Sequence, residues 1–486
     1  MLYELAYTLA GLVALAYAAD FAFGLRDDPR EPRRVRPRIP FIGHVLGIVR
    51  YGSAYYSQTR QRETENEIYA LDVVALKLYV EQKASKTLSF RPFTNVAARD
   101  MAGNSEPACD LFNGPLVDEY SQVVKIALLP GSHQDNQNLR MANSVISLVD
   151  GISNEGKEKP MGLLESTKHV IVEANSCAEV EKALWSVFIA LVLIVSIRTW
   201  GWQAHLHSHM AGLDFFGKAN KERKVVHKAF FKWCRELRDD TSKVLLDRQR
   251  IVKAAGMDFE DAAKQETLFC VAIFSNTAPT LYWTIWELFS RPALLEEVRD
   301  ELEEHAITRD EGDKDGEGTA QHTLDITALK TQCAILLSMF IDNGRYLLRK
   351  GNYVQMPGAP IHYDESVWGP TAKTFDPEAK QPGSKPFAPL PAGFLAWGTP
   401  LHLCPARQFA TTEILITVAL LAVQYHLVPV ASNSEWEKNP AIDYNDVVAV
   451  FNPLKDVEVE AKPRKGAGNW TVKMGKSKTQ VVIASG

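Results

Sequence analysis

The amino-acid sequence predicts a mostly α-helical protein with a small β part, and three helical segments carry that prediction. Phe269–Phe289 is a long, largely apolar run without recognisable cap residues. In Leu294–Glu304, apolar and charged side chains repeat at helical spacing, which is typical of an amphipathic surface helix. Ala406–Gln424 is a third helical run. Two short runs of β-forming residues, Val447–Phe451 and Thr479–Ile483, predict small strands near the C-terminus.

The N-terminal segment, residues 1–25, predicts a transmembrane anchor. Leu5–Ala19 carries no charge and the apolar character continues to Leu25, while a helix needs about 20 residues to cross a bilayer. Glu4 and Asp20 lie near the two ends, where their carboxylates can reach lipid headgroups. Basic residues follow the run and none precedes it, so we expect the rest of the chain in the cytoplasm. A buried N-terminal helix followed by a polar loop is the alternative.

Residues 26–45 predict a basic, proline-rich linker. This segment holds six arginines, and its four prolines cannot continue a helix, so they stiffen the connection. No further break in composition follows. We therefore expect residues 46–486 to form one domain.

The composition excludes several classes of protein. With 46% hydrophobic and 23% charged residues, the chain is globular rather than disordered. A net charge of −5 gives no case for nucleic-acid binding. The six cysteines are scattered and form no Cys-x-x-Cys pair or Cys/His cluster at zinc spacing. Separate thiols in a reducing compartment are therefore the simpler interpretation.

Cys404 is the candidate for chemistry. It follows a glycine-containing turn segment and stands just before the apolar helix Ala406–Gln424. Amides and the dipole at a helix start stabilise an anion, so we expect the thiol to be held as a thiolate, the form that an iron ligand must have. From this residue alone, a small buried hydrophobic side chain is the commoner interpretation of a lone cysteine beside a helix.

The segment around Cys404 resembles the heme-binding signature of the cytochrome P450 superfamily. Trp397 stands at the aromatic position, Gly398 at the first glycine, His402 at the basic residue that contacts a heme propionate, and Cys404 at the axial ligand. Arg407 continues the match into the following helix. The resemblance implies a cytochrome P450-like fold and heme b as the cofactor, its iron bound by the Cys404 thiolate.

Two positions in this segment depart from the family pattern. Pro400 and Ala406 stand where glycines are expected. Glycine permits unusual torsions and a close approach of backbone to heme, whereas proline fixes φ and removes an N–H. We therefore expect the loop before Cys404 to be re-formed.

The long helix carries a second resemblance, at Ala272–Pro279, to the oxygen-activating helix of the family. Asn276 precedes Thr277 where an acid is usual, as in the branch that contains prostacyclin synthase and the sterol 7α- and 12α-hydroxylases, together with fungal relatives. Pro279 cannot donate to the carbonyl of Ser275, so we expect the helix to be opened and bent there. The Thr277 hydroxyl could then order water or protonate bound oxygen. A buried, proline-kinked helix without chemistry is the alternative.

The Glu-x-x-Arg pair of the family is absent from its expected place. The helix Leu324–Phe340 runs directly into Ile341–Gly351, so part of the helix and of the sheet before the meander is predicted to be missing. Glu296 and Arg299 have the right spacing, but they lie on the amphipathic helix and predict an exposed, weak i,i+3 ion pair.

Together, these resemblances imply a heme-thiolate monooxygenase anchored in the endoplasmic reticulum membrane by a single pass, with its catalytic domain in the cytoplasm. The implied partners are dioxygen, an NADPH-dependent flavoprotein reductase and an apolar substrate of sterol, terpenoid or polyketide type, as in secondary metabolism. Thr277 and Asn276 would deliver protons. Two alternatives stay open: a heme-dependent peroxide isomerase that needs no reductase, and a heme-free, non-catalytic descendant of the family.

Overall fold

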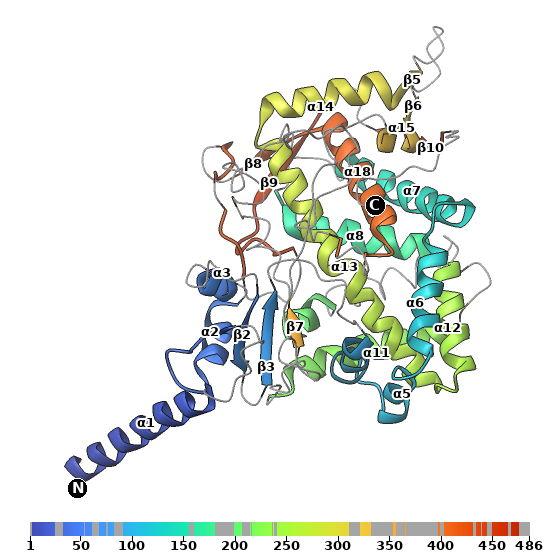
Figure 1. Ribbon diagram of the computed structural model, residues 1–486. Coiled ribbons are helices and arrows are strands. Elements are labelled where there is room, and N and C mark those ends of the chain that lie inside the picture. The colour runs from blue at the N-terminus through green and yellow to red at the C-terminus, as the bar shows by residue number, and fades with distance from the viewer. Residues whose placement is uncertain are drawn as a thin grey trace. The chain divides into compact units, whose positions relative to one another are not determined.

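The computed structural model describes residues 2–24, 33–52, 54–60, 68–73, 76–81, 91–154, 160–179, 199–206, 214, 216–235, 237, 241–310, 321–331, 353–355, 365, 397–398, 403–430, 434–438, 440–444, 450–464 and 468–475. The chain divides into two compact units (Figure 1). Unit 1 comprises Met1–Leu88 and Ser338–Leu403 with Gly486, and unit 2 comprises Ser89–Leu337 and Cys404–Ser485. Helices predominate and the sheets are small, which confirms the predicted fold class. The predicted gap after Phe340 lies outside the described residues.

Unit 1 combines a long N-terminal helix with a small mixed sheet. Its helices are α1 (Leu2–Gly24), α2 (Gly43–Tyr51) and α3 (Ala54–Arg60), and its strands are β1 (Arg33–Arg34), β2 (Ile68–Val73), β3 (Leu76–Glu81) and β7 (Tyr353–Gln355). The strand order is β1-β2-β3-β7, in which β2 and β3 form an antiparallel hairpin and β7 runs parallel to β3. Val35, Tyr56 and Leu71 form its small core.

The last turns of α1 are bonded to the segment that follows them. The Arg34 guanidinium pairs with the Asp20 carboxylate at 2.7 Å, and both side chains are at most 10% exposed. The Tyr17 hydroxyl donates to the carbonyl oxygen of Arg38 at 2.7 Å. The expectation that Asp20 reaches lipid headgroups is wrong, because a buried carboxylate requires a partner and Arg34 supplies it.

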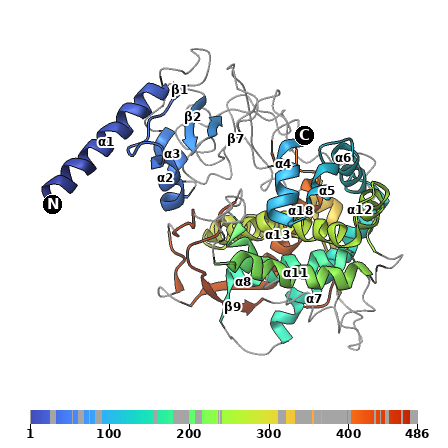
Figure 2. The same cartoon turned by 90° about the horizontal axis from the view of Figure 1, so that it is seen from below.

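Unit 2 is built on helices of very different length. Their bounds are α4 (Arg91–Val96), the π-helix η1 (Ala97–Ala102), α5 (Glu106–Leu111), α6 (Leu116–Ala127), α7 (Ser132–Asn154), α8 (Leu163–Glu179), α11 (Lys218–Arg235), α12 (Lys243–Ala254), α13 (Phe259–Phe289), α14 (Pro292–His305), α15 (Ile326–Thr331) and α18 (Arg407–Gln424). The main apolar core lies where α7, α8, α13 and α18 pack together (Figures 1 and 2).

Two hydrogen bonds define the direction of the helices in this bundle. The Tyr425 hydroxyl, just past the end of α18, donates to the Val149 carbonyl near the end of α7 at 2.8 Å. Because α7 and α18 pack along each other, they run in the same direction and begin at the same end of the bundle. Asn175, near the end of α8, donates to Glu413, near the start of α18, so α8 runs in the opposite direction.

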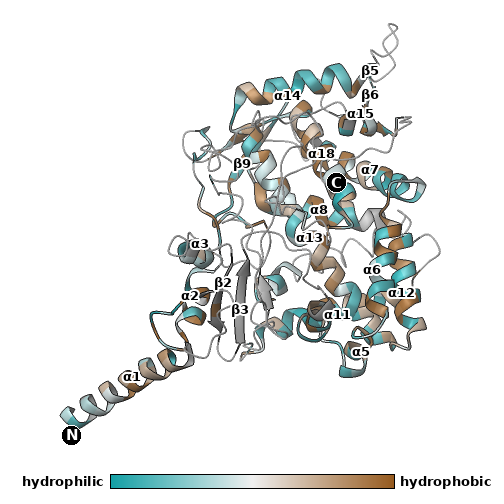
Figure 3. Ribbon diagram, in the orientation of Figure 1, coloured by the Kyte–Doolittle hydropathy of each residue, from teal (hydrophilic) through white to brown (hydrophobic). Residues whose placement is uncertain are grey.

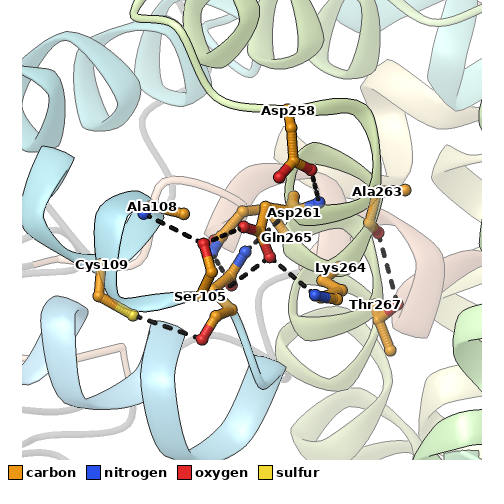
Figure 4. Close-up of polar contacts among 10 residues, drawn as sticks. Ser105, Ala108, Cys109, Asp258, Asp261, Ala263, Lys264, Gln265 and Thr267 are labelled. Atoms are coloured by element: carbon orange, nitrogen blue, oxygen red, sulfur yellow. Dashed lines mark hydrogen bonds and ion pairs between the residues drawn. The ribbon is translucent and has the colours of Figure 1, made fainter.

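The start of α13 is capped and bonded to the start of α5. An Asp258 carboxylate oxygen accepts the Asp261 N–H at 2.8 Å, so the predicted lack of a cap is wrong. The Asp261 carboxylate in turn accepts the N–H of Ser105 at 3.1 Å and its hydroxyl, and it pairs with Lys264 at 2.8 Å (Figure 4). These contacts fix where α13 begins.

Unit 2 also carries two three-stranded sheets. Their strands, in sheet order, are β10 (Trp470–Lys473), β6 (Gln321–Asp325) and β5 (Ile307–Asp310), then β4 (Met161–Gly162), β9 (Glu458–Pro463) and β8 (Tyr425–Pro429). Of the predicted strand Val447–Phe451, the structure describes only Val450 and Phe451, and neither is in a strand. The Phe451 carbonyl accepts the Trp283 indole N–H of α13 at 2.8 Å. The other predicted strand, Thr479–Ile483, lies outside the described residues.

Within the described residues, α13 is the helix long and apolar enough to cross a membrane. Half of its most apolar window is buried inside the protein, and it packs against α8, α11 and α18, so it is a core helix. Ala10–Ala22 in α1 is a shorter apolar stretch. Figure 3 shows hydrophobic residues along most of α1.

Candidate functional site

Cys404 lies at the end of the helix bundle where α18 begins. Its carbonyl oxygen accepts two hydrogen bonds from Arg407, one from the backbone N–H at 3.3 Å and one from the guanidinium at 3.2 Å. The cysteine side chain is partly exposed, whereas nearly every residue of α18 is buried. A partly exposed cysteine therefore directly precedes a buried helix, and Arg407 of that helix bonds its backbone.

The surroundings of the Cys404 thiol act on its pKa in opposite directions. Burial raises the pKa, the N–H of Ala406 lowers it, and so do the charge and the N–H of Arg407, but burial prevails. The expectation that the helix start alone holds a thiolate is therefore wrong, because two amide donors and one cation do not offset the loss of water. A bound metal cation deprotonates a coordinating thiol. A partly exposed cysteine whose thiol has two backbone N–H groups and one cation acting to lower its pKa is a donor set that fits an axial heme-iron ligand.

The backbone torsions near Cys404 show whether replacing the family glycine by Ala406 causes strain. Ala406 has φ −86° and ψ 3°, a conformation open to any L-residue, so the second departure from the family pattern causes no strain. Gly398, in unit 1, has φ +87° and uses the freedom of glycine. Trp397 precedes it and is partly buried. Pro400 and His402 lie outside the described residues.

Asn276 and Thr277 are neighbours on α13 but face different surroundings. The Thr277 side chain is buried, and its hydroxyl donates to the carbonyl of Ile273 at 2.8 Å, one turn back. The Asn276 side-chain oxygen accepts the N–H of Val450 at 3.4 Å, so Asn276 faces the C-terminal segment beside α13. The two side chains therefore have different hydrogen-bond partners, and their role in proton delivery stays a prediction.

Pro279 does not interrupt α13, which remains helical from Phe259 to Phe289. The proline removes the N–H that would bond the Ser275 carbonyl, as predicted. Three threonine hydroxyls near it, those of Thr277, Thr280 and Thr284, donate to carbonyls one turn back. Such bonds bend helices without breaking them. The helix is therefore continuous through Pro279, and the predicted local opening and bend at Pro279 stays a prediction.

Arg299 was expected in an exposed ion pair, and the structure corrects this. Its side chain is 4% exposed, whereas that of its partner Glu296 is 60% exposed. The guanidinium donates to the carbonyls of Ala422 at 2.8 Å and Tyr425 at 2.9 Å, at the C-terminal end of α18. Arg299 shares the apolar face of α14 with the buried Leu295, and this position was the signal for its burial.

Glu413 is a second residue that sequence reasoning missed. It is 1% exposed on α18, accepts one hydrogen bond from Asn175 at 2.7 Å, and burial raises its pKa to about 8. A carboxyl group in this state is protonated at neutral pH and joins α8 to α18 as a neutral polar pair. The available signal was a single acid within the apolar run that follows Cys404.

Comparisons with known proteins give relatives along most of the chain. No protein-family model matches the sequence. The chain is 28% identical to the cytochrome P450 monooxygenase nodJ of Hypoxylon pulicicidum, over 90% of this chain and 91% of that protein. It is 23% identical to a cytochrome P450 monooxygenase of Gibberella zeae, over 87% and 86% of the two chains. A shorter match, 24% identical over 38% of this chain and 51% of the relative, is to the 25-hydroxycholesterol 7-alpha-hydroxylase of Rattus norvegicus.

Three independent features agree with these matches. The fold is mostly helical with small sheets, Cys404 precedes a buried helix, and that helix packs against the long helix that carries Thr277. Both fungal relatives are monooxygenases and cover nearly the whole chain. The chain belongs to the cytochrome P450 superfamily, as a member of fungal type.

Proposed function

We propose that this protein is a membrane-bound, heme-thiolate monooxygenase in which Cys404 is the axial ligand of heme b. The observation that carries the proposal is Cys404, which is partly exposed, directly precedes a buried helix and lies where the backbone N–H groups of Ala406 and Arg407 act to lower the pKa of its thiol. Amide donors to a ligand sulfur tune the metal that it binds. When bound, a thiolate-ligated heme activates dioxygen for transfer of one oxygen atom to the substrate.

The chain's own residues would position the cofactor and move protons. We assign His402 and Arg407 to the heme propionates, and Trp397 and Gly398 to the loop that covers the heme. We assign Thr277 to proton delivery through water: its hydroxyl donates its hydrogen to the Ile273 carbonyl, and its lone pairs would accept a hydrogen bond from the water molecule that carries the proton. Asn276 supports this step by accepting the N–H of Val450, which holds that residue beside α13.

The proposed substrate is an apolar small molecule of sterol, terpenoid or polyketide type. One relative carries a sterol substrate in its name, and two fungal relatives are monooxygenases. The reaction takes dioxygen and two electrons, which we assign to NADPH through a flavoprotein reductase. A secondary-metabolic role follows from the fungal type of the chain.

We further propose that α1 anchors the protein in the endoplasmic reticulum membrane, that residues 26–45 link it to the catalytic domain, and that this domain, residues 46–486, faces the cytoplasm. Large apolar side chains of α1 are exposed along its length, including Tyr7 at 77% and Leu15 at 65%. Asp20 and Arg34 hold the last turn against the following segment. Residues 2–19 remain, and at 1.5 Å per residue they span roughly 27 Å, about the hydrocarbon thickness of that membrane.

The reduced, carbon-monoxide-bound difference spectrum of the purified full-length protein tests the proposal. We expect the absorption band of thiolate-ligated heme, its loss in Cys404→Ala, and NADPH-dependent turnover with a reductase. Arg309→Gln, an exposed position in unit 2, is the control that keeps the band. A folded protein without the band would overturn the heme assignment.

One observation favours the heme-free alternative. The sequence has no Glu-x-x-Arg pair between Leu324 and Gly351, where the family places it. Losing a buried ion pair costs roughly 3–5 kcal/mol when only one partner goes, and less when both are absent. Titration with hemin decides between the two: stoichiometric uptake supports the monooxygenase, and no uptake by folded protein supports the heme-free descendant.

A further inference from the structure

A row of aromatic rings leads from α13 to the C-terminal segment of unit 2. The ring centroids of Trp283 and Trp286 are 6.0 Å apart, and those of Trp286 and Trp436 are 6.4 Å apart. Tyr282 lies against Trp283, with 5.0 Å between their centroids. Each pair is within the roughly 4.5–7 Å that separates aromatic rings in direct contact. Trp283, Trp286 and Trp436 are here called the tryptophan row.

The inner end of the tryptophan row shares one face of α13 with Asn276. Trp283 follows Asn276 by two turns, roughly 10 Å along the helix axis, and residues at this spacing lie on the same side of a helix. Two hydrogen bonds agree with this placement. Asn276 accepts the N–H of Val450 at 3.4 Å, and the Trp283 indole N–H donates to the carbonyl of the next residue, Phe451, at 2.8 Å. Both side chains therefore reach the same short segment.

The outer end of the tryptophan row meets solvent. Trp286 is 5% exposed, whereas Trp436 is only half-buried and stands between the exposed acids Glu435 and Glu437. Negative charges beside an indole ring favour a positive charge on that ring. The row therefore joins a buried position on α13 to a surface position at which a positive charge is stabilised.

The hydrogen bonds of these rings decide which of them can pass on an electron. Tyrosine and tryptophan rings can each lose one electron, but a phenol must release its proton at the same time. Within the described residues, the Tyr282 hydroxyl has no hydrogen-bond partner that could take this proton. Burial, together with the carboxylates of Asp456 and Glu437, also raises the pKa of Tyr282. An oxidised indole can keep its N–H, so the tryptophans form the path and Tyr282 does not.

We propose that the tryptophan row is a protective electron-transfer path, through which low-molecular-weight thiols reduce the heme site when it is oxidised in the absence of substrate. This inference rests on the proposed function, which places heme and dioxygen beside Thr277 and its neighbour Asn276. Without such a path, an oxidant formed at the heme would attack whichever side chain lies nearest to it.

Each step of the path moves one electron inwards. Trp283 gives an electron to the oxidised heme site, Trp286 restores Trp283, Trp436 restores Trp286, and a thiol at the surface restores Trp436. A hydroperoxide that reacts at the heme needs two electrons and two protons to become an alcohol and water. Two thiols supply both and combine to a disulfide. One O–O and two S–H bonds are broken, and two O–H bonds and one S–S bond are formed.

Packing alone would also account for a cluster of aromatic rings in a core. Trp286→Phe separates the two roles, because phenylalanine keeps an aromatic ring in the core but is much harder to oxidise. Within the described part of the chain, the Trp286 indole N–H has no hydrogen-bond partner, so this substitution removes no hydrogen bond.

Reaction of the heme-loaded, full-length protein with cumene hydroperoxide, without substrate, tests the path. Freeze-quenched samples are examined by electron paramagnetic resonance, with and without ring-deuterated tryptophan, and oxidised residues are mapped by mass spectrometry. Trypsin cuts after Arg407 and Lys438, so Trp436 is the only tryptophan in its peptide. We expect a tryptophan radical and addition of oxygen to Trp436. Glutathione should suppress both and be converted to its disulfide.

Trp286→Phe should abolish the oxidation of Trp436 and move the added oxygen to the peptide that contains Trp283. Trp436→Phe, at the half-buried end, is the second variant and should likewise confine oxidation to Trp283 and Trp286. Tyr282→Phe should leave the radical and the oxidation pattern unchanged. Thermal unfolding shows whether each variant is folded.

Trp202→Phe is the matched control. Trp202 is fully buried, and within the described residues its indole N–H also has no partner, but it packs in a separate cluster with Met101 and Val271. Its replacement should leave oxidation of Trp436 unchanged. A loss of that oxidation in Trp202→Phe equal to the loss in Trp286→Phe would count against a path through the tryptophan row.

The remaining outcomes separate this inference from the proposed function. Oxidation of Trp436 that persists in folded Trp286→Phe would overturn the path, because the oxygen would then come directly from peroxide in solution. A protein that shows the band of thiolate-ligated heme but no tryptophan radical would overturn the path and leave the heme assignment in place. A folded protein without that band would overturn both.

Discussion

The Arg299 guanidinium donates to the Tyr425 carbonyl oxygen at 2.9 Å, so a side chain of α14 terminates α18. It also bonds the Ala422 carbonyl at 2.8 Å. The last carbonyls of a helix have no intrahelical donor and carry partial negative charge, which a buried cation neutralises. Arg299 thus stabilises the far end of the helix whose start supports Cys404.

Arg299→Ala should destabilise the protein by roughly 3 kcal/mol, since it removes the buried cation that donates to the carbonyls of Ala422 and Tyr425. Glu296→Ala should cost at most about 1 kcal/mol, because that carboxylate is largely in water. Denaturant unfolding followed by circular dichroism measures both. Equal losses of stability in the two variants would mean that the Glu296–Arg299 ion pair, rather than the capping of α18 by Arg299, stabilises the protein.

Glu413 should make stability depend on pH. Its pKa is raised from 4.5 to about 8 in the folded protein, so the folded state holds a proton that the unfolded state releases. The group's contribution is therefore fully present below pH 4.5 and is lost as the pH rises towards 8.

Glu413→Gln keeps a neutral partner for Asn175 and should remove that pH dependence. Relative to the natural protein, the variant should gain stability progressively between pH 4.5 and pH 8, by several kcal/mol at the upper end. Urea unfolding at a series of pH values measures the gain. Glu297→Gln, an exposed acid of α14, is the control, and a flat difference for Glu413→Gln would contradict the buried neutral acid.

Backbone torsions separate two glycine positions of the heme signature. Gly398→Ala should cost about 1–2 kcal/mol, because φ +87° strains any side chain, and should lower heme content. Ala406→Gly restores the family residue but should not raise heme affinity, since φ −86° already suits alanine. Hemin titration of both variants is the measurement. Stronger heme binding by Ala406→Gly would show that the methyl group, rather than the torsion, was limiting.

Helix positions were largely predictable from the sequence, because burial imposes a period on the residues. The amphipathic pattern of Leu294–Glu304 lies within α14, and the apolar run Ala406–Gln424 matches α18 within one residue. The start of α13 at Phe259 was not predictable from the spacing of apolar residues, because the first turn of this helix is acidic. That turn is held in place by contacts with Ser105, which is distant in sequence.

Which charged side chains are buried was not predictable, because their burial depends on partners distant in sequence. Arg299 finds carbonyls more than a hundred residues away, and Glu413 finds Asn175 on another helix. The sequence suggests that Asp20 faces lipid headgroups, but in the structure its carboxylate pairs with Arg34. Local patterns specify which side chains are apolar, but tertiary contacts decide which polar ones are buried.

The Asp20–Arg34 pair should behave as a buried ion pair. Asp20→Ala or Arg34→Ala alone should cost roughly 3 kcal/mol, since each leaves one charge without its partner in a closed site. The double variant should cost clearly less than the sum of the two. Thermal unfolding in detergent micelles measures the cycle, with Arg50→Ala as the exposed control. Additive losses would mean that the two charges do not interact.

The junction between α5 and α13 should be sensitive to acid. Burial raises the pKa of Asp261, but hydrogen bonds from Lys264 and Ser105 outweigh this and hold it below its usual 3.8. A depressed pKa contributes stability that is present above pH 3.8 and is lost as the pH falls through the folded-state value. At neutral pH, Ser105→Ala should cost about 1–2 kcal/mol, because it removes both a helix cap and a donor to Asp261.

Asp261→Asn should cost more than Ser105→Ala at neutral pH, since it removes the charge that Lys264 faces (Figure 4). As the pH falls from 3.8 through the lower folded-state pKa, the natural protein loses the same charge, so the difference between it and Asp261→Asn should shrink towards zero. Asp110→Asn, an exposed acid on α5, should show neither effect. Urea unfolding of the four proteins at neutral and acidic pH measures the difference, and a gap that persists in acid would mean that Asp261 acts by shape and not by charge.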